Sequence, residues 1–203
     1  NILNNANILL QKAEAQNSPH YAGVARILMA YAAGNLTDAF GDIPLSDALK
    51  GAQNTQPRYD PQSQVYQTIG QWLDQAIQDL DKQSVLSPGS EDYFYGGDRA
   101  KWKKAAYALK ARYAIHLTKR DAAAASNAAL AAIANGFASN SDDLVMRFGS
   151  SPTNANPLFG FVQDRNDIRI APYFAQLLNR LQDPRRPMIG AKPKTATDSI
   201  PDN

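Results

Sequence analysis

DPQSQVYQTIGQWLDQAIQDLDK, residues 60–82, is the stretch that decides the fold class. Asp60 followed by Pro61 predicts a helix start, with the aspartate as N-cap and the proline in the first helical position. Apolar residues then recur every three or four positions, which is the period of one helix face. They are Val65, Ile69, Trp72, Leu73, Ala76, Ile77 and Leu80. A long helix with one apolar face must bury that face against another layer of structure.

The same spacing of apolar residues recurs on both sides of this stretch. Upstream, two helices are expected, and Asn17-Ser18-Pro19 separates them, because a proline disfavours a helical residue before it. Downstream, Asp98 is the expected N-cap of a helix whose first inward residue is Trp102. An alanine-rich helix follows, and its small side chains allow a neighbouring helix to approach closely. Besides 60–82, the predicted helices are 2–16, 19–40, one from Asp98, 121–135 and one from Pro172 that ends before 183–187.

No segment alternates apolar and polar residues as a strand does. Residues 41–59, 87–97 and 137–169 are rich in Gly, Pro, Ser, Asn and Asp, which predicts loops. The sequence therefore predicts an all-α fold of helical hairpins, of the tetratricopeptide-like α/α superhelix type, with long structured loops. We expect a single domain over residues 1–203, incomplete at both ends, because the chain opens inside a helix and stops without a structural break.

Composition excludes several classes of function. The 203 residues contain 21 Lys and Arg against 19 Asp and Glu, a net charge of +2, and the basic residues are scattered. A nucleic-acid binder usually gathers them on one face, so we expect no nucleic-acid partner. The lack of cysteine excludes disulfides, thiolate nucleophiles and cysteine-ligated zinc. No apolar run approaches the roughly 20 residues of a membrane helix.

The aromatic stretch Asp92-Tyr93-Phe94-Tyr95-Gly96-Gly97-Asp98 is the best candidate for ligand contact. Tyr93 and Tyr95 offer ring faces that match the apolar C–H face of a sugar, and hydroxyls for its edge. The alternative is that these rings pack on the helical hairpin below them. The two aspartates are not spaced as in a calcium loop, and Asp98 already serves as an N-cap, so no metal is expected.

Other candidates are weaker. Asn156 and Arg165, in the predicted loop 137–169, are good partners for sugar hydroxyls, although any solvated loop contains such residues. His20, expected to be exposed at a helix start, and His116 form no metal-binding pattern. There is no GxSxG, phosphate-loop or dinucleotide motif, and no carboxylate pair stands out for glycan hydrolysis. We therefore expect neither an enzyme nor a cofactor.

The turn at residues 38–44, DAFGDIP, has two interpretations. It fits a contact surface, but it fits a helix end better. In the second interpretation Phe40 anchors the helix in the core, Gly41 takes a left-handed conformation and Pro44 prevents the helix from continuing.

Four segments together resemble the SusD/RagB family. They are 31–49, ending in TDAFGDIPLSDAL; 59–80, opening with YDPQ; 92–112, containing DYFYGGDRAKWKK; and Asn156-Pro157-Leu158 with Asp183-Pro184-Arg185. They occur in the family's order across most of the chain. Family members are usually more than twice as long and carry a lipoprotein signal and an anchoring cysteine, which this sequence does not contain.

The resemblance implies a lipoprotein on the surface of the bacterial outer membrane. Such a protein captures an oligosaccharide, without catalysis, for import by a SusC-like TonB-dependent transporter, and its N-terminal lipid anchor would lie outside this sequence. A peptide-binding importer of the RagB kind is the near alternative, because the scaffold does not specify the cargo. A helical-repeat scaffold for protein partners and, more remotely, an all-helical glycoside hydrolase are the alternatives from other classes.

Overall fold

The computed structural model describes residues 2–149, 151, 153–165 and 170–189, and over these residues the fold is all-α, as predicted. Two compact units, Asn1–Arg147 and Phe148–Asn203, make up the chain and are described separately below. The helices of the first unit are α1 (Ile2–Ala15), α2 (Pro19–Phe40), α3 (Gln62–Asp79), α4 (Arg99–His116) and α5 (Ala122–Ile133), with short 3-10 turns η1 (Gly51–Gln53) and η2 (Asn140–Asp142). Those of the second unit are α6 (Pro157–Arg165), α7 (Pro172–Arg180) and α8 (Arg186–Ile189).

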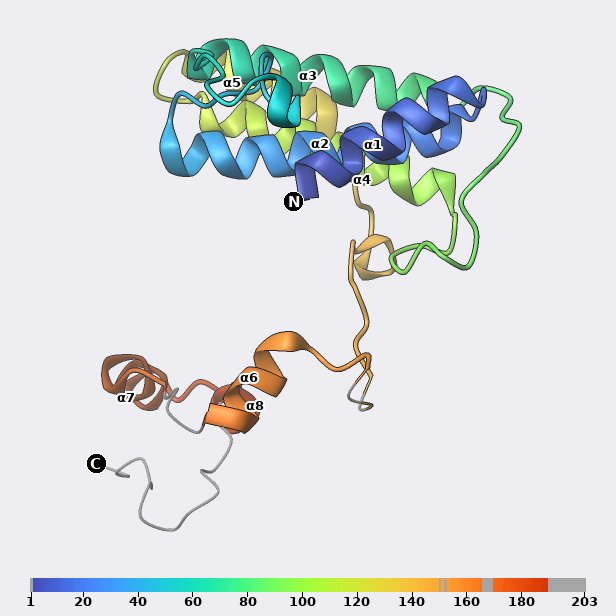
Figure 1. The fold of residues 1–203 in the computed structure, drawn as a ribbon. Coiled ribbons are helices and arrows are strands. Elements are labelled where there is room, and N and C mark those ends of the chain that lie inside the picture. The colour runs from blue at the N-terminus through green and yellow to red at the C-terminus, as the bar shows by residue number, and fades with distance from the viewer. Residues whose placement is uncertain (1, 150, 152, 166–169, 190–203) are drawn as a thin grey trace. The chain divides into compact units, whose positions relative to one another are not determined.

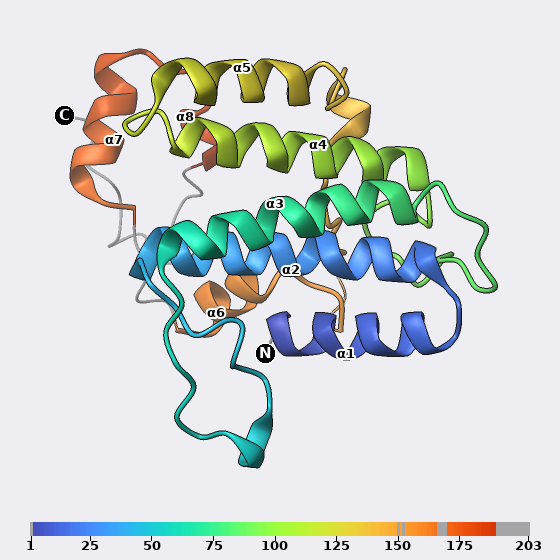
Figure 2. The same ribbon diagram turned by 90° about the horizontal axis from the view of Figure 1, so that it is seen from above.

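The five long helices of the first unit form a row in chain order. Each helix packs against the next, from α1 to α5, and neighbours run in opposite directions (Figures 1 and 2). The connections from α1 to α2 and from α4 to α5 are short, whereas long loops join α2 to α3 and α3 to α4, and the antiparallel neighbours form stacked helical hairpins. The prediction of helical hairpins is confirmed.

The core of the first unit lies on α2, α3 and α4. Helix α3 buries the face predicted from its spacing, with Leu73 1% exposed. The indole of Trp102 enters from α4 and is also 1% exposed, as expected for the first inward residue of that helix. Burying one such side chain contributes roughly 1.5–3 kcal/mol, so this cluster holds the three helices together. Its buried members are Val24, Ile27, Ala30, Ala33, Ile43, Leu45, Val65, Ile69, Leu73, Ala76, Leu80, Trp102, Ala106 and Tyr113.

The second half of α2 buries small residues instead of the large ones predicted there. Phe40, expected to anchor the helix in the core, is 75% exposed. The buried face contains Gly34, where an added Cβ would lie 2.2 Å from the hydroxyl oxygen of Tyr113. Close approach of α4 therefore requires small residues on the inward face of α2, and the larger side chains lie outside. Gly41 has a φ of 75°, the positive value predicted after the helix, and its N–H donates to the carbonyl of Thr37 at 2.8 Å.

Of the two predicted aspartate N-caps, Asp98 is present and Asp60 is not, and Asp121 is a further N-cap that was not predicted from the sequence. Asp98 accepts a hydrogen bond from the Lys101 amide at 3.1 Å, and Asp121 accepts one from the Ala124 amide at 2.9 Å. The prediction for Asp60 is wrong. Its carboxylate is buried and accepts from the Leu45 amide at 3.0 Å and from the amide and hydroxyl of Ser46 at 2.7 and 2.6 Å. These donors, led by the Ser46 hydroxyl, lower the pKa of Asp60, and they close the loop between α2 and α3.

The second unit contains a helix where the sequence predicted a loop. Helix α6 occupies residues that were placed in the loop 137–169, and its first turn is capped by the side-chain oxygen of Asn156, which accepts from the Leu158 amide at 2.9 Å. Helix α7 begins at Pro172, as predicted. It ends at Arg180, before residues 183–187 as predicted, and the short helix α8 then begins inside that segment. Asp183 lies just before α8, and hydrogen bonds from Arg185 lower its pKa to about 2.

Candidate functional site

The loop that carries the predicted ligand contacts is fixed to the α1–α2 junction. We call residues 87–98 the aromatic loop. Just before it, the Leu86 amide donates to Ser18 Oγ at 3.2 Å. At its first residue, Ser87 Oγ lies 2.7 Å from Nδ1 of His20, and Nε2 of the same ring lies 2.8 Å from the carbonyl of Lys82. His20 was predicted to be exposed and is instead 6% exposed, because the residues after α3 cover it.

Asp92 organises the interior of the aromatic loop. Its Oδ1 accepts hydrogen bonds from the amides of Phe94 and Tyr95 at 3.0 and 3.3 Å. Its Oδ2 accepts from the Gly97 amide at 3.0 Å and from Trp102 Nε1 at 2.7 Å. One carboxylate therefore joins three amides of the loop to a core tryptophan of α4. Hydrogen bonds to an ionised acceptor are about twice as strong as neutral ones, which makes the loop conformation well defined.

Gly97 allows the two ends of this loop to meet. Its φ is 86°, and a Cβ there would lie 2.1 Å from the carbonyl oxygen of Pro88. Any side chain at this position would collide with the backbone at the beginning of the loop. The aromatic loop is thus closed as well as anchored.

The two predicted tyrosines lie in different environments. The Tyr95 ring packs edge-to-face on Trp102, with centroids 5.3 Å apart, and its hydroxyl donates to the carbonyl of Asp142 at 2.6 Å. Burial, followed by the nearby carboxylate of Asp142, raises the pKa of Tyr95. Tyr93 is 76% exposed. The loop therefore holds Tyr95 and presents Tyr93 to solvent.

The other two predicted contacts, Asn156 and Arg165, belong to the second unit. The Asn156 side-chain oxygen caps α6, as described above, and the residue is exposed. Arg165 lies at the end of α6 with its guanidinium 5.0 Å from the ring centroid of Phe161, a cation–π contact. The structure brings Tyr93 and Tyr95 together in one loop, and it places Asn156 and Arg165 at the two ends of α6.

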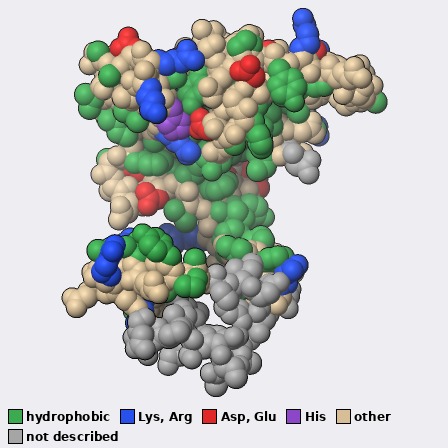
Figure 3. Space-filling model, turned by 90° about the vertical axis from the view of Figure 1, so that its left-hand side faces the viewer, with side chains coloured by type: hydrophobic (Ala, Val, Ile, Leu, Met, Phe, Trp, Pro, Cys, Tyr) green, Lys and Arg blue, Asp and Glu red, His purple; other side chains and the backbone are tan. Residues whose placement is uncertain are grey.

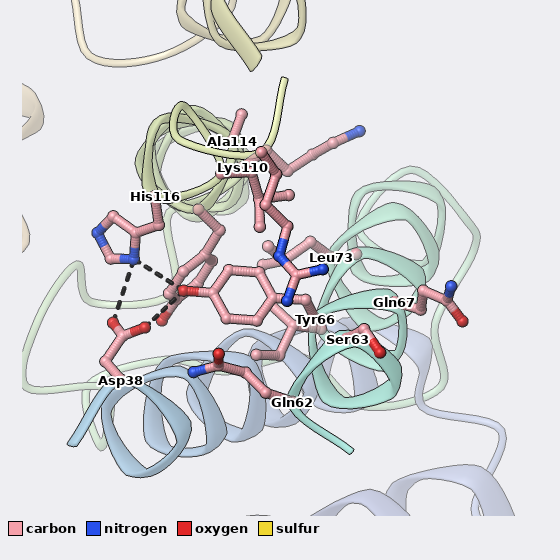
Figure 4. Close-up of a pocket in the computed structure, with 14 residues that line it drawn as sticks. Asp38, Gln62, Ser63, Tyr66, Gln67, Leu73, Lys110, Ala114 and His116 are labelled. Atoms are coloured by element: carbon pink, nitrogen blue, oxygen red, sulfur yellow. Dashed lines mark hydrogen bonds and ion pairs between the residues drawn. The ribbon is translucent and has the colours of Figure 1, made fainter. Parts of the chain in front are cut away.

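A cavity that the sequence did not reveal lies in the first unit, where the end of α2 meets the start of α3 and the end of α4. Its volume is about 760 Å³. Figure 4 shows Asp38, Tyr66 and His116 meeting at one side, each from a different helix. The Tyr66 hydroxyl donates to Asp38 at 2.5 Å and lies 3.0 Å from Nδ1 of His116, which is itself 3.2 Å from the Asp38 carboxylate. Burial and this carboxylate raise the pKa of Tyr66, so the hydroxyl remains protonated.

The cavity combines an apolar floor with a polar rim. Ile69 and Leu73 lie at its base, whereas Gln67 and Arg120 are exposed at its edge. Figure 3 looks onto this end of the unit, where hydrophobic side chains are interspersed with acidic and basic groups and a histidine. Pockets of a few hundred cubic ångströms with such a lining are the usual form of small-molecule sites.

Two further properties of the described residues bear on function. No helix among them is both long and apolar enough to cross a membrane. They contain no group of three or more His, Asp or Glu side chains arranged to hold a metal ion.

Comparison with known proteins decides the family. The family model described as "starch-binding associating with outer membrane", of the SusD-like type, matches residues 1–201. This chain belongs to the SusD-like family. No curated protein matches it.

Solved SusD-like structures share the fold. A SusD/RagB family protein from Bacteroides thetaiotaomicron is 31% identical with a TM-score of 0.79, covering 90% of this chain and 39% of its own. A structure named as a chitin-binding protein is 31% identical with a TM-score of 0.76, covering 92% and 40%. A chitin-binding SusD homologue from Flavobacterium johnsoniae is 27% identical with a TM-score of 0.76, covering 91% and 39%. The chain thus spans about two fifths of the length of these SusD-like proteins.

Proposed function

We propose that this SusD-like chain is the glycan-binding, non-catalytic component of an outer-membrane uptake system. Its partner would be a SusC-like TonB-dependent transporter, and the protein would be held on the cell surface by a lipid anchor. The match of nearly the whole chain to a family described as starch-binding carries this proposal. Two similar structures named as chitin-binding support a neutral polysaccharide as cargo.

The aromatic loop supplies the ligand contact in this proposal. Tyr93 is exposed on a loop that Asp92, Gly97 and Tyr95 hold in one conformation. A ring that is held in place before binding loses little conformational entropy when a sugar stacks on it. The smaller entropic cost makes the free energy of binding more favourable. We propose Tyr93 as the stacking contact, with Tyr95 contributing chiefly by supporting it. Asn156 and Arg165, which belong to the second unit, are a separate proposal for polar contacts with a sugar.

The experiment that tests this function is affinity gel electrophoresis of the full-length protein in gels that contain starch or soluble chitin derivatives. Retardation without release of reducing sugar would support a binder. The variant Tyr93→Ala should weaken retention about tenfold in Kd, which corresponds to about 1.4 kcal/mol. Tyr59→Ala is the matched control, because Tyr59 is 70% exposed on a different loop.

Each result decides between the candidates. Retention that Tyr93→Ala does not change would keep the function and remove the aromatic loop as the site. Retention of peptides, with no glycan retained at millimolar concentration, would favour the peptide-binding alternative. Sugar release would contradict the non-catalytic assignment.

A further inference from the structure

Three glycines lie inside the long helices of the first unit, and two of them are explained by close packing. A Cβ on Gly23 would lie 2.9 Å from Cγ of Leu80, and a Cβ on Gly34 would lie 2.2 Å from the Tyr113 hydroxyl oxygen. In both places only a glycine lets α2 approach its neighbours. A helix-interior glycine costs roughly 1 kcal/mol relative to alanine, so such a contact is a sufficient reason for it.

Gly70, the third, has no such neighbour in this chain. It lies in the middle of α3, and a Cβ built there would meet no atom within 4 Å. Its backbone forms part of the wall of the cavity between α2, α3 and α4. A glycine at a site where a backbone borders an open cavity is typical of close approach by a bound group.

We propose that this cavity binds a segment of an uncharged oligosaccharide that passes over Gly70, as a second sugar site separate from the aromatic loop. The inference rests on the proposed function. The volume of about 760 Å³ has room for more than one sugar ring and lies within the range of small-molecule sites.

The polar groups of the cavity suit a ligand with many hydroxyls. The side chains of Ser63, Gln67 and Arg120 are exposed at its edge and hydrogen-bond to none of the described residues. A hydroxyl, an amide and a guanidinium together can donate to and accept from sugar oxygens. Beside them, Tyr66 offers a ring, and Leu117, which is 39% exposed, offers an apolar surface on which the C–H face of a sugar can rest.

Apart from Arg120 at its exposed edge, the charged groups of the cavity are already paired within the chain, which favours an uncharged ligand. The Asp38 carboxylate is already engaged by the Tyr66 hydroxyl and by His116. Lys110, on the opposite wall, forms an ion pair with Asp74. An apolar protein helix placed here would remove these groups from water without replacing their hydrogen bonds, which is costly, whereas sugar hydroxyls can bond to them.

A cavity-filling substitution at Gly70 tests the proposal. Gly70→Phe places a ring in the cavity, and the open space around Gly70 removes the usual risk of a clash in the core. Gly70→Ala is the matched control, because it changes the same backbone position and leaves most of the volume. The double variant Ser63→Ala, Gln67→Ala removes two exposed rim groups and should leave folding unchanged, as surface substitutions usually do.

The probes are triacetylchitotriose and maltotriose, added to full-length protein labelled with 15N-glycine. We expect one of them to shift the Gly70 amide resonance in the wild type and in Tyr93→Ala. Gly70→Phe should lower the number of sites found by calorimetry by one. The rim double variant should weaken binding at this site about tenfold.

The outcomes separate this inference from the proposed function. Binding that Tyr93→Ala reduces, with a Gly70 resonance that no probe shifts, would overturn the second site and leave the proposed function standing. Full binding by Gly70→Phe with unchanged stoichiometry would also overturn the second site. If neither probe nor any other glycan binds the wild type, the proposed function fails, and this inference fails with it.

Discussion

Asp92→Ala should be the most damaging truncation of a side chain in the aromatic loop. The variant removes the hydrogen-bond acceptor of Trp102 Nε1. Because Trp102 is 1% exposed, its indole N–H is then buried without a partner. An unsatisfied buried donor costs about 1–3 kcal/mol. The amides of Phe94, Tyr95 and Gly97 lie in a partly exposed loop and can return to water, so together they add about 1 kcal/mol. We expect a loss of about 3 kcal/mol in the free energy of unfolding.

Urea titration, monitored by tryptophan fluorescence, measures this loss. An unchanged dependence of the free energy of unfolding on urea concentration would indicate that the native fold is retained. Asp98→Ala is the control, because it removes an exposed N-cap only six residues away and should cost about 1 kcal/mol. Asp92→Asn keeps one acceptor oxygen, so its loss of stability should lie between those of Asp92→Ala and Asp98→Ala. A loss for Asp92→Ala no larger than that of the cap variant would refute the idea that this carboxylate joins the loop to the core. A stable variant that still binds glycan as the wild type does would refute its role in positioning Tyr93.

Two further predictions concern other parts of the first unit. Gly70→Ala should raise the free energy of unfolding by about 1 kcal/mol, because its Cβ meets open space. Gly23→Ala should lower the free energy of unfolding, because its Cβ would lie 2.9 Å from Leu80. Thermal unfolding of the two variants checks both signs, and a stabilising Gly23→Ala would contradict the packing of α2 on α3. The folded pKa of Asp60 lies below its unfolded value of 3.8, so its contribution to stability is present above that value and is lost as the pH falls through the lowered pKa. Asp60→Asn should therefore flatten the acid side of the stability curve between about pH 5 and 2, measured by urea titration at each pH, and an unchanged curve would mean that Ser46 does not hold this carboxylate.

Local sequence signals predicted α1 to α5, α7 and the Asp98 cap of α4. Asp98 acts within three residues of its own position, and Pro172 begins its helix by fixing its own backbone. Helix α6 was missed because it is only nine residues long and has Gly160 inside it, so no face repeats often enough to show a period.

Features that depend on distant residues were not predictable. Phe40 continues the apolar spacing of α2, but the close approach of α4 selects a different face of that helix. Asp60 precedes a proline, as an N-cap would, but Ser46 offers it a buried set of donors. In the cavity, Tyr66 lies 28 residues from Asp38 and 50 from His116, so no local motif connects the three side chains.

The contrast between Tyr93 and its loop has a consequence for how cargo preference can change. Every anchoring contact of the loop is made by other positions, chiefly Asp92, Tyr95 and Gly97. A substitution at the exposed position 93 should therefore alter stability by less than about 0.5 kcal/mol. The side chain proposed to meet the ligand is thus free to be exchanged, by mutation or by design, while the frame that presents it remains the same. If the proposed function holds, libraries at position 93 alone would test which sugars the aromatic loop can select without disturbing the fold.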